Sequence, residues 1–296
     1  MTSTMTTMNK KKSIIVTGSN GFLGRNLCEE LETRSWNLIK IDRESDGIDL
    51  STKLGQESLE EALTRPDVDS IVMMAASIGV DMFESNPLDA FRNNLAIDQN
   101  CIRSIERISK MHEKKFNLFY YSSSEAFGSL RDKKEFFNGF SSAVNFTTMN
   151  PRSLYACEKA MTEAVINALF KNNSSPFKTA MVFRPFNICG RWQRRGYMHK
   201  MVKTAIEHGE IHFAIDTTRE VTPVDIATKA SADKIDEQLK AGDSKVFNDR
   251  CMCVSIGSGM CYRMEDIAKA VNYVLLTSGA ISRLAKLMPY EKDDFI

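Results

Sequence analysis

Three glycines at intervals of three residues stand between a short apolar run and an amphipathic run near the start of the chain. The apolar run covers residues 13–17, the glycines are Gly18, Gly21 and Gly24, and the amphipathic run continues to about residue 33. A strand, a tight turn and a helix in this order hold an anion, because glycine admits the backbone close to a phosphate and the helix N-terminus presents unpaired N–H groups. The residues expected to contact such a ligand are Gly18, Asn20, Gly21, Phe22, Leu23 and Gly24. The alternative is that these glycines only make a turn.

The remainder of the first 185 residues alternates strand patterns with helical patterns. Near-continuous apolar runs, typical of strands that are covered on both faces, occupy residues 36–41, 71–76, 116–122 and 178–184. Helical patterns lie between them at residues 58–63, 87–112 and 151–171. Because such alternation requires right-handed crossovers, we predict an α/β fold with a doubly wound parallel sheet, the Rossmann fold.

Beyond residue 185 the alternation weakens. Helices are predicted at residues 197–208, 225–240 and 264–276, and a short strand at 211–215. We therefore predict a disordered tail at residues 1–12, a dinucleotide-binding domain at 13–185, and a smaller, mostly helical substrate-binding part at 186–296. Some strands or helices of this second part can pack with the first domain.

Composition argues against several classes of partner. The chain has 39 basic and 38 acidic residues, so there is no global charge to attract nucleic acid or an anionic membrane. The first twelve residues lack the apolar core of a secretory signal, and the longest apolar stretch, residues 71–80, is too short to span a bilayer. Seven scattered cysteines and four histidines form no metal-binding or disulfide pattern. We expect a cytoplasmic protein without a metal.

An acidic residue follows the second predicted strand. Asp42 lies eighteen positions after Gly24, where a carboxylate can accept hydrogen bonds from both ribose hydroxyls of an adenosine. A 2′-phosphate would be repelled there, so the position favours NAD over NADP. The neighbouring Arg43 weakens this preference.

A tyrosine and a lysine four residues apart occupy the predicted helix at 151–171. Tyr155 and Lys159 therefore lie on one helical face. A phenol is a poor base at neutral pH, but an ammonium group ~4 Å away at an effective dielectric constant of ~20 contributes up to about 4 kcal/mol, nearly three pKa units, before desolvation. The positive charge of a nicotinamide would add to this effect, so we expect Tyr155 to act as a base near neutral pH and Lys159 to bind the nicotinamide ribose. A solvated helix face is the alternative.

Three serines and a glutamate follow the predicted strand at 116–122. Because Ser122, Ser123, Ser124 and Glu125 come after its carboxyl end, they are expected at the sheet edge where ligands of doubly wound folds bind. A serine there can hold a sugar hydroxyl that is being oxidised, and the Ser–Glu pair can donate or accept a second proton. The alternative is that the serines cap the strand end.

Taken together, these motifs resemble the extended short-chain dehydrogenases/reductases that modify nucleotide sugars. The resemblance spans about residues 13–275 and rests on the segments 17–24, 123–128, 184–190 and 256–259, together with Asp42, Asp49, Leu50, Ala75, Ala76, Asn94, Tyr155, Lys159, Thr218, Arg219, Val224 and Asp225.

The resemblance implies roles for further residues. Cofactor-binding roles fall on Asp49, Leu50, Ala75, Ala76, Asn94, Ser122, Pro185 and Phe186, and substrate-binding roles on Ser77, Glu125, Asn187, Arg191 and Arg219. Asn187 and Arg219 would hold the substrate's diphosphate, for which Arg194 and Arg195 are additional candidates. The cofactor is then NAD, and the partner a nucleotide-diphosphate sugar.

The family's shared first step is the oxidation of a sugar hydroxyl, usually at C4, to a 4-keto intermediate. By resemblance, Tyr155 takes the proton and Ser123 holds the oxygen. Epimerases need little more, whereas dehydratases and decarboxylases use a Ser–Glu or Asp–Glu pair directly after the catalytic serine or threonine. Since Ser124 and Glu125 look like that pair, Glu125 would remove the C5 proton in a dehydratase, or would handle the carboxylate with Arg219 in a decarboxylase.

We therefore expect an enzyme, a lyase or isomerase of dehydratase or decarboxylase type. Three alternatives stay open: a nucleotide-sugar 4-epimerase, a keto-sugar reductase using NADPH, and a non-catalytic dinucleotide-sensing protein. Members of the family often dimerise through two helices, so residues 87–112 and 151–171 are expected to form a homodimer contact.

Overall fold

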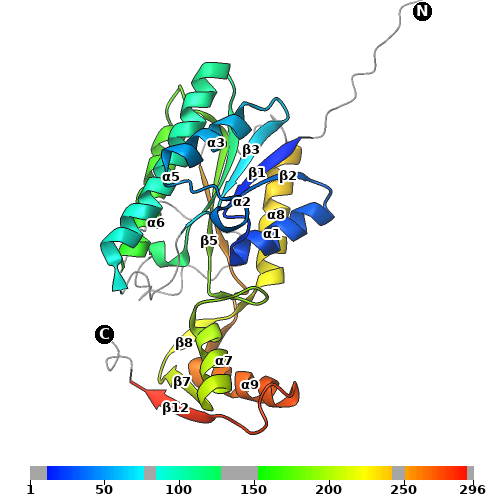
Figure 1. The fold of residues 1–296 in the computed structure, drawn as a ribbon, viewed down its shortest axis with the longest axis vertical. Helices are drawn as coiled ribbons and strands as arrows, with labels where there is room; N and C mark the ends of the chain where they lie inside the picture. The colour runs from blue at the N-terminus through cyan, green and yellow to red at the C-terminus, as the bar shows by residue number, and fades with distance from the viewer. Residues whose placement is uncertain (1–11, 77–84, 128–152, 242–250, 292–296) are drawn as a thin grey trace, which may run out of the picture.

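Six parallel strands form the central sheet of the protein. The computed structural model describes residues 12–76, 85–127, 153–241 and 251–291. The strands are β1 (Ser13–Thr17), β2 (Asn37–Ile41), β3 (Val68–Met73), β4 (Phe116–Tyr121), β5 (Phe177–Pro185) and β10 (Met252–Ile256), in the spatial order β10-β5-β4-β3-β1-β2. All five pairings are parallel, and helices cover the sheet on both faces (Figure 1). The predicted doubly wound α/β fold is confirmed.

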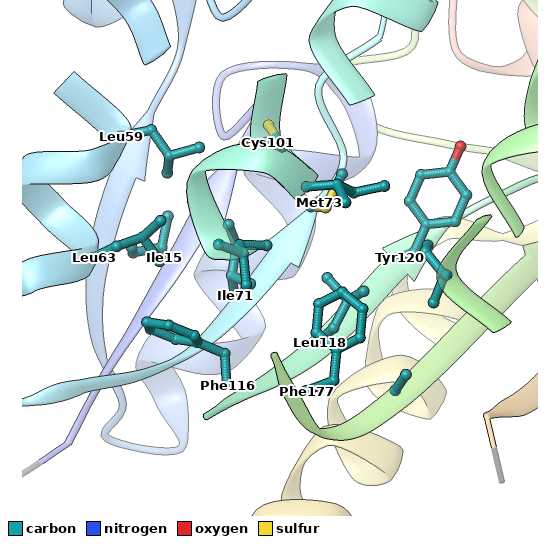
Figure 2. Packing of buried hydrophobic residues seen from close by; sticks show 14 of the residues in the cluster. Ile15, Leu59, Leu63, Ile71, Met73, Cys101, Phe116, Leu118, Tyr120 and Phe177 are labelled. Atoms are coloured by element: carbon teal, nitrogen blue, oxygen red, sulfur yellow. The ribbon is translucent and has the colours of Figure 1, made fainter. Parts of the chain in front are cut away.

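Each face of the sheet carries its own apolar core, because successive strand residues point to opposite sides. On one face, Ile15, Ile71 and Leu118 pack with α3 (Lys53–Thr64), α5 (Pro87–His112) and α6 (Leu154–Phe170), as Figure 2 shows for part of the cluster. On the other face, strand residues such as Val72 and Phe119 pack against α1 (Phe22–Thr33) and α8 (Val224–Ala241). Burial on both faces explains why these strands read as continuous apolar runs.

The chain leaves the sheet earlier than the sequence suggested at the third strand. That strand was expected at residues 71–76, but β3 ends at Met73. The next two backbone N–H groups, those of Met74 and Ala75, donate to the side-chain hydroxyl of Thr17 on the neighbouring strand β1, at 3.1 and 3.3 Å. This contact ties the ends of β1 and β3 together.

The second part of the chain divides between the sheet and a separate lobe. Strand β10, which was not predicted, pairs with β5, and α8 covers the sheet beside α1. The second lobe comprises α7 (Tyr197–His208), β7 (Glu210–Ala214), β8 (Thr218–Glu220), β11 (Cys261–Arg263), α9 (Met264–Thr277) and β12 (Lys286–Tyr290), around a third apolar core. It lies beyond one end of the sheet (Figure 1). Two short strands, β6 (Ile188–Cys189) and β9 (Thr222–Pro223), pair with each other between the two parts.

Candidate active site

A cavity of about 380 Å³ opens at the carboxyl ends of the strands, where the chain leaves β1 and β3 in different directions. This is the topological switch point at which doubly wound folds bind ligands. The predicted residues that line it are Gly18, Asn20, Gly21, Phe22, Leu23, Gly24, Asp42, Asp49, Leu50, Ala75, Ala76, Ser122, Tyr155, Lys159 and Pro185. Residues from segments far apart in the sequence thus meet at one place.

Two glycines of the first turn are required by its geometry. Gly18 has a φ of +69°, and a Cβ atom there would lie 2.8 Å from the backbone of Ala75. At Gly24 a Cβ atom would lie 2.0 Å from the carbonyl oxygen of Gly18. The turn therefore packs against the β3 segment and the start of α1 without side chains, which leaves the helix N-terminus open to an anion. This cradle fits the diphosphate of a dinucleotide.

Two carboxylates are held in fixed orientations at the far end of the cavity. Asp42 accepts the backbone N–H of Asn20 at 3.1 Å and that of Glu44 at 2.7 Å, and so caps the short helix α2 (Arg43–Asp46). Asp49 accepts from the backbone N–H and the hydroxyl of Ser51, and these hydrogen bonds lower the pKa of Asp49. Asp42 keeps lone pairs for ribose hydroxyls, since each carboxylate oxygen accepts two hydrogen bonds.

The sequence did not predict that the segment 192–195 forms one wall of this cavity. Trp192, Gln193, Arg194 and Arg195 line it together with Arg25 and Arg43. The Trp192 ring lies 5.0 Å from the guanidinium of Arg25, and Arg194 forms an ion pair of 3.6 Å with Glu44 of α2. Arg194 and Arg195 were expected as candidates for the substrate's diphosphate, but they line the same cavity as the glycine turn. In the sequence, the signal that could have indicated this wall is a tryptophan among three arginines directly after Gly190.

Arg191 turns away from this cavity. It forms an ion pair with Glu29 of α1, and its carbonyl oxygen accepts from Asn26 at 3.0 Å. The predicted substrate-binding role would require this ion pair to open. The segment 191–195 is thus anchored on α1 at its start and reaches the cavity with its remaining residues.

A serine, a tyrosine and a lysine meet at the inner end of the cavity. The hydroxyl of Ser123 is hydrogen-bonded to Tyr155, and Ser123 Oγ also accepts the backbone N–H of Glu125 at 3.2 Å. Ser124 and Glu125 begin a 3-10 helix, Ser124–Phe127, and Glu125 is half-buried. The neighbouring Ser122 donates to the buried Glu163 of α6.

Burial outweighs the lysine in setting the pKa of Tyr155 in the chain alone. Burial raises the pKa of Tyr155; Lys159 lowers it, but by less than burial raises it, and Glu158 adds to the increase. Although burial alone would lower the pKa of Lys159, the acidic side chains of Asp98 and Glu158 raise it above its ordinary value. Lys159 is therefore a permanent cation, but in the chain by itself the pKa of Tyr155 is raised, so its action as a base near neutral pH stays a prediction for the protein with NAD bound.

The other predicted residues lie around this site without lining the cavity. Asn94 is buried and donates to Glu158 at 3.4 Å, and the Phe186 ring packs 5.9 Å from that of Phe127. Asn187 is exposed with a φ of +42°, and Arg219 is exposed on β8. Ser77 lies outside the described residues. So does the segment 129–150, for which the sequence made no prediction of structure.

Two negative findings concern only the described residues. None of their helices is long and apolar enough to cross a membrane. Within the same ranges, no group of three or more His, Cys, Asp or Glu side chains comes together to hold a metal ion.

Comparisons with known proteins agree with this architecture. The UDP-glucose 4-epimerase of Thermus thermophilus, in complex with NAD, has a TM-score of 0.69 and 17% identity, over 95% of this chain and 87% of that one. The dTDP-glucose 4,6-dehydratase DesIV of Streptomyces venezuelae, with NAD and TYD bound, has a TM-score of 0.70 and 18% identity, over 96% and 86%. The UDP-glucose 4-epimerase of Brucella ovis, also with NAD, has a TM-score of 0.71 and 16% identity, over 95% and 86%. At these identities the likeness shows the fold alone.

A match to the sequence model of a family goes further than the fold. The model is described as "NAD dependent epimerase/dehydratase family" and matches residues 14–218, which include the glycine turn, Asp42, Ser123, Tyr155 and Lys159. The predicted resemblance is confirmed by this match. The chain belongs to the NAD-dependent epimerase/dehydratase family, whose cofactor is NAD.

Proposed function

We propose that this protein is an enzyme that modifies a nucleotide-diphosphate sugar through a 4-keto intermediate, with chemistry of the dehydratase or decarboxylase type. The observation that carries the proposal is the meeting of Ser123, Tyr155 and Lys159 at the edge of a cavity built for a dinucleotide. A protein that only sensed a dinucleotide would need the glycine turn and Asp42, but no hydrogen-bonded serine and tyrosine beside it.

Different residues of the cavity bind different parts of NAD. The glycine turn and the N-terminus of α1 bind the diphosphate, Asp42 binds the adenosine ribose, and Lys159 binds the nicotinamide ribose. When bound, NAD supplies the electron acceptor and a positive charge close to Tyr155. Because burial raises the pKa of Tyr155 in the chain alone, proton transfer from the sugar hydroxyl to Tyr155 depends on added positive charge. Ser123 holds the same sugar oxygen by a hydrogen bond.

Glu125 supports dehydratase or decarboxylase chemistry over simple epimerisation. Its backbone N–H donates to Ser123 Oγ at 3.2 Å, so residue 125 lies directly beside the serine that would hold the sugar oxygen. As a base, Glu125 would remove the C5 proton of a keto-sugar; with Arg219, it would instead handle a sugar carboxylate before its loss as carbon dioxide. A 4-epimerase is the second candidate, because solved structures with this fold include UDP-glucose 4-epimerases.

The first experiment identifies the cofactor and the reaction together. The purified protein is denatured, the released dinucleotide is identified by mass spectrometry, and nucleotide sugars are screened for loss of water, loss of carbon dioxide or change of configuration. Tyr155→Phe should abolish turnover while NAD stays bound, and full activity in that variant would refute the proposal. Stoichiometric release of oxidised NADP would instead identify a keto-sugar reductase.

A second pair of variants separates the reaction types. Glu125→Gln should stop a dehydratase or decarboxylase after oxidation, so that a keto-sugar and reduced cofactor accumulate. In an epimerase the same variant should keep its turnover. Arg219→Ala should raise KM for the nucleotide sugar if Arg219 holds the diphosphate, with the NAD content unchanged.

We further propose that the enzyme is a cytoplasmic homodimer. Leu154, Met161 and Val165 are exposed on one face of α6, at the spacing of a helical stripe. All seven cysteines lie in described segments and are unpaired, as expected for a reducing compartment. Met161→Glu should shift the protein from dimer to monomer in analytical ultracentrifugation, whereas Leu284→Glu on the second lobe should not.

A further inference from the structure

Three titratable side chains whose charges act on Tyr155 lie buried close to it. Glu158 is 0% exposed, Asp98 2% and Lys159 3%. Glu158 and Lys159 come from α6 and Asp98 from α5, the two helices that pack together on this face of the sheet. Ionised groups so deeply buried are costly unless their charges balance. Two carboxyl groups beside one ammonium group do not balance unless a proton is also present.

The hydrogen bonds indicate where that proton resides. Asp98 Oδ2 accepts from the hydroxyl of Tyr120 at 2.7 Å and from that of Thr162 at 2.9 Å, so Asp98 is solvated as a carboxylate would be. The carboxyl group of Glu158 lies next to that of Asp98 but receives only a long hydrogen bond, from Asn94 to Oε2 at 3.4 Å, and burial raises the pKa of Glu158. Two carboxyl groups can share a hydrogen bond only when one of them is protonated. The proton therefore sits on Glu158 and is shared with Asp98.

Lys159 connects this carboxyl pair, Asp98 and Glu158, to the site. Its Nζ atom lies 3.5 Å from Oε1 of Glu158 and donates to the hydroxyl of Tyr120 at 3.1 Å. Figure 2 shows that the Tyr120 hydroxyl points out of the apolar cluster that surrounds its ring. Lys159 Nζ also lies 5.9 Å from the centre of the Tyr155 ring. The lysine is thus close to both Tyr155 and the carboxyl pair.

The state of the shared proton decides how much of the lysine charge Tyr155 experiences. With the proton in place, the cluster of Lys159, Asp98 and Glu158 is neutral overall. Without it, the cluster carries one net negative charge, which opposes ionisation of Tyr155. The titratable groups that face Glu158 are Asp98 of α5, Tyr120 of β4, and Tyr155 and Lys159 of α6; Asn94 and Thr162 complete its polar surroundings.

We propose that the carboxyl pair Asp98–Glu158 holds one shared proton and thereby sets the pH range in which Lys159 can promote ionisation of Tyr155. Glu158 is then a positioning residue, since it acts on Tyr155 through Lys159 and by its own charge, without lining the cavity. The inference rests on the proposed function only in that the reaction uses Tyr155 as its base.

The test follows the ionisation of Tyr155 itself and needs no substrate. The full-length protein with its bound NAD is produced with tyrosine carrying carbon-13 at Cζ, and the seven tyrosine signals are titrated by NMR. The Tyr155 signal is identified by its loss in Tyr155→Phe. Glu158→Gln keeps the shape and a hydrogen bond to Asp98 but removes the negative charge. We expect the acid dissociation constant of Tyr155 to increase about tenfold in this variant.

Matched variants exclude a merely structural effect. Glu237→Gln removes a glutamate that is half exposed on α8 and should leave the Tyr155 signal unchanged. Asp98→Asn removes the other member of the carboxyl pair and should shift Tyr155 in the same direction, which keeps the test open if Glu158→Gln does not fold. An unchanged Tyr155 midpoint in the folded variants would overturn the inference.

Turnover provides an independent readout once a substrate is found. The acid limb of kcat/KM against pH should move to lower pH in Glu158→Gln by the amount that NMR reports for Tyr155. If no nucleotide sugar is turned over, the proposed function fails while the NMR result still decides the present inference. An NMR shift without a matching shift of the acid limb would show that the carboxyl pair does not set the pH range of the reaction. That result would overturn the inference.

Discussion

The two ends of the active site use charged residues in opposite ways. Beneath the sheet edge, Glu163 and Arg184 are both 0% exposed and bind each other through two hydrogen bonds. In the segment 191–195, Arg194 is 71% exposed and has a single long ion pair with Glu44. A buried charge pair with fixed partners holds a geometry, whereas exposed charges can change partners when a ligand enters. The first region therefore fixes Ser122, which donates to Glu163, and the second is free to adjust around the cofactor.

The strongest test of this contrast is the buried ion pair. Arg184→Ala leaves the Glu163 carboxylate buried without its partner, and should lower the free energy of unfolding by about 3–5 kcal/mol. Urea denaturation measures this loss. The matched variant in the second lobe is Lys269→Ala, which breaks an exposed ion pair with Glu265 on α9 and should leave the midpoint unchanged.

A double variant shows whether charge or volume is responsible. Replacing Arg184 and Glu163 together by methionine removes both charges while keeping most of the packing, and should cost less than Arg184→Ala alone. Equal losses in the single and double variants would mean that the ion pair does not dominate the stability of this edge.

Glycine substitutions extend the comparison to the backbone. In Gly24→Ala, a Cβ atom 2.0 Å from the carbonyl oxygen of Gly18 must displace the turn. We expect NAD affinity to fall at least about 100-fold, or ~2.8 kcal/mol, in calorimetric titration of the stripped protein. Gly209→Ala, in the second lobe, meets nothing within 4 Å and should keep NAD affinity. A folded Gly24→Ala protein that binds NAD normally would show that the turn is not the diphosphate cradle.

The sequence was sufficient for most of the sheet. Strand 13–17 and helices 87–112 and 197–208 have the predicted limits, because their apolar spacing has no competing explanation. Strand β10 was missed: Met252–Ile256 is short, and it joins the sheet only by pairing with β5, which lies about seventy residues earlier. Local patterns cannot reveal a partner so distant in the sequence.

For the site, motifs identified the residues but not their electrostatics. The spacing of Tyr155 and Lys159 correctly brought the two side chains together, yet in the chain alone burial and Glu158 outweigh the lowering of the Tyr155 pKa by Lys159. In the sequence, Glu158 stands between Tyr155 and Lys159. Its burial depends on the packing of α5, which the spacing of those two residues does not specify. The same limit applies to Arg194 and Arg195, whose place beside α2 follows from the path of the chain after β5.

A smaller effect concerns the cost of burying the carboxyl pair. Because burial raises the pKa of Glu158 above its unfolded value, the folded state binds this proton more tightly. Stability that this proton contributes is therefore lost as the pH rises above the ordinary glutamate range of about 4.3. Glu158→Gln cannot lose a proton, so its stability relative to the parent should increase between pH 5 and pH 8 by on the order of 2 kcal/mol. Urea denaturation at several pH values measures this difference, and a constant difference would contradict the shared proton.

The smallest expected effect concerns the segment 191–195, the end of the active site that is free to adjust around the cofactor. Trp192 is half exposed, and its ring lies 5.0 Å from the guanidinium of Arg25 and 5.3 Å from that of Arg191. An exposed cation–π contact contributes about 0.5–1 kcal/mol, so Trp192→Ala should weaken NAD binding about two- to fivefold. Trp192→Phe keeps an aromatic ring over the arginines and should lose less. Raising the salt concentration should reduce the difference between parent and Trp192→Ala, since salt screens exposed charges. A loss as large as that expected for Gly24→Ala would mean that this segment is as fixed as the glycine turn, and the contrast between the two ends would not hold.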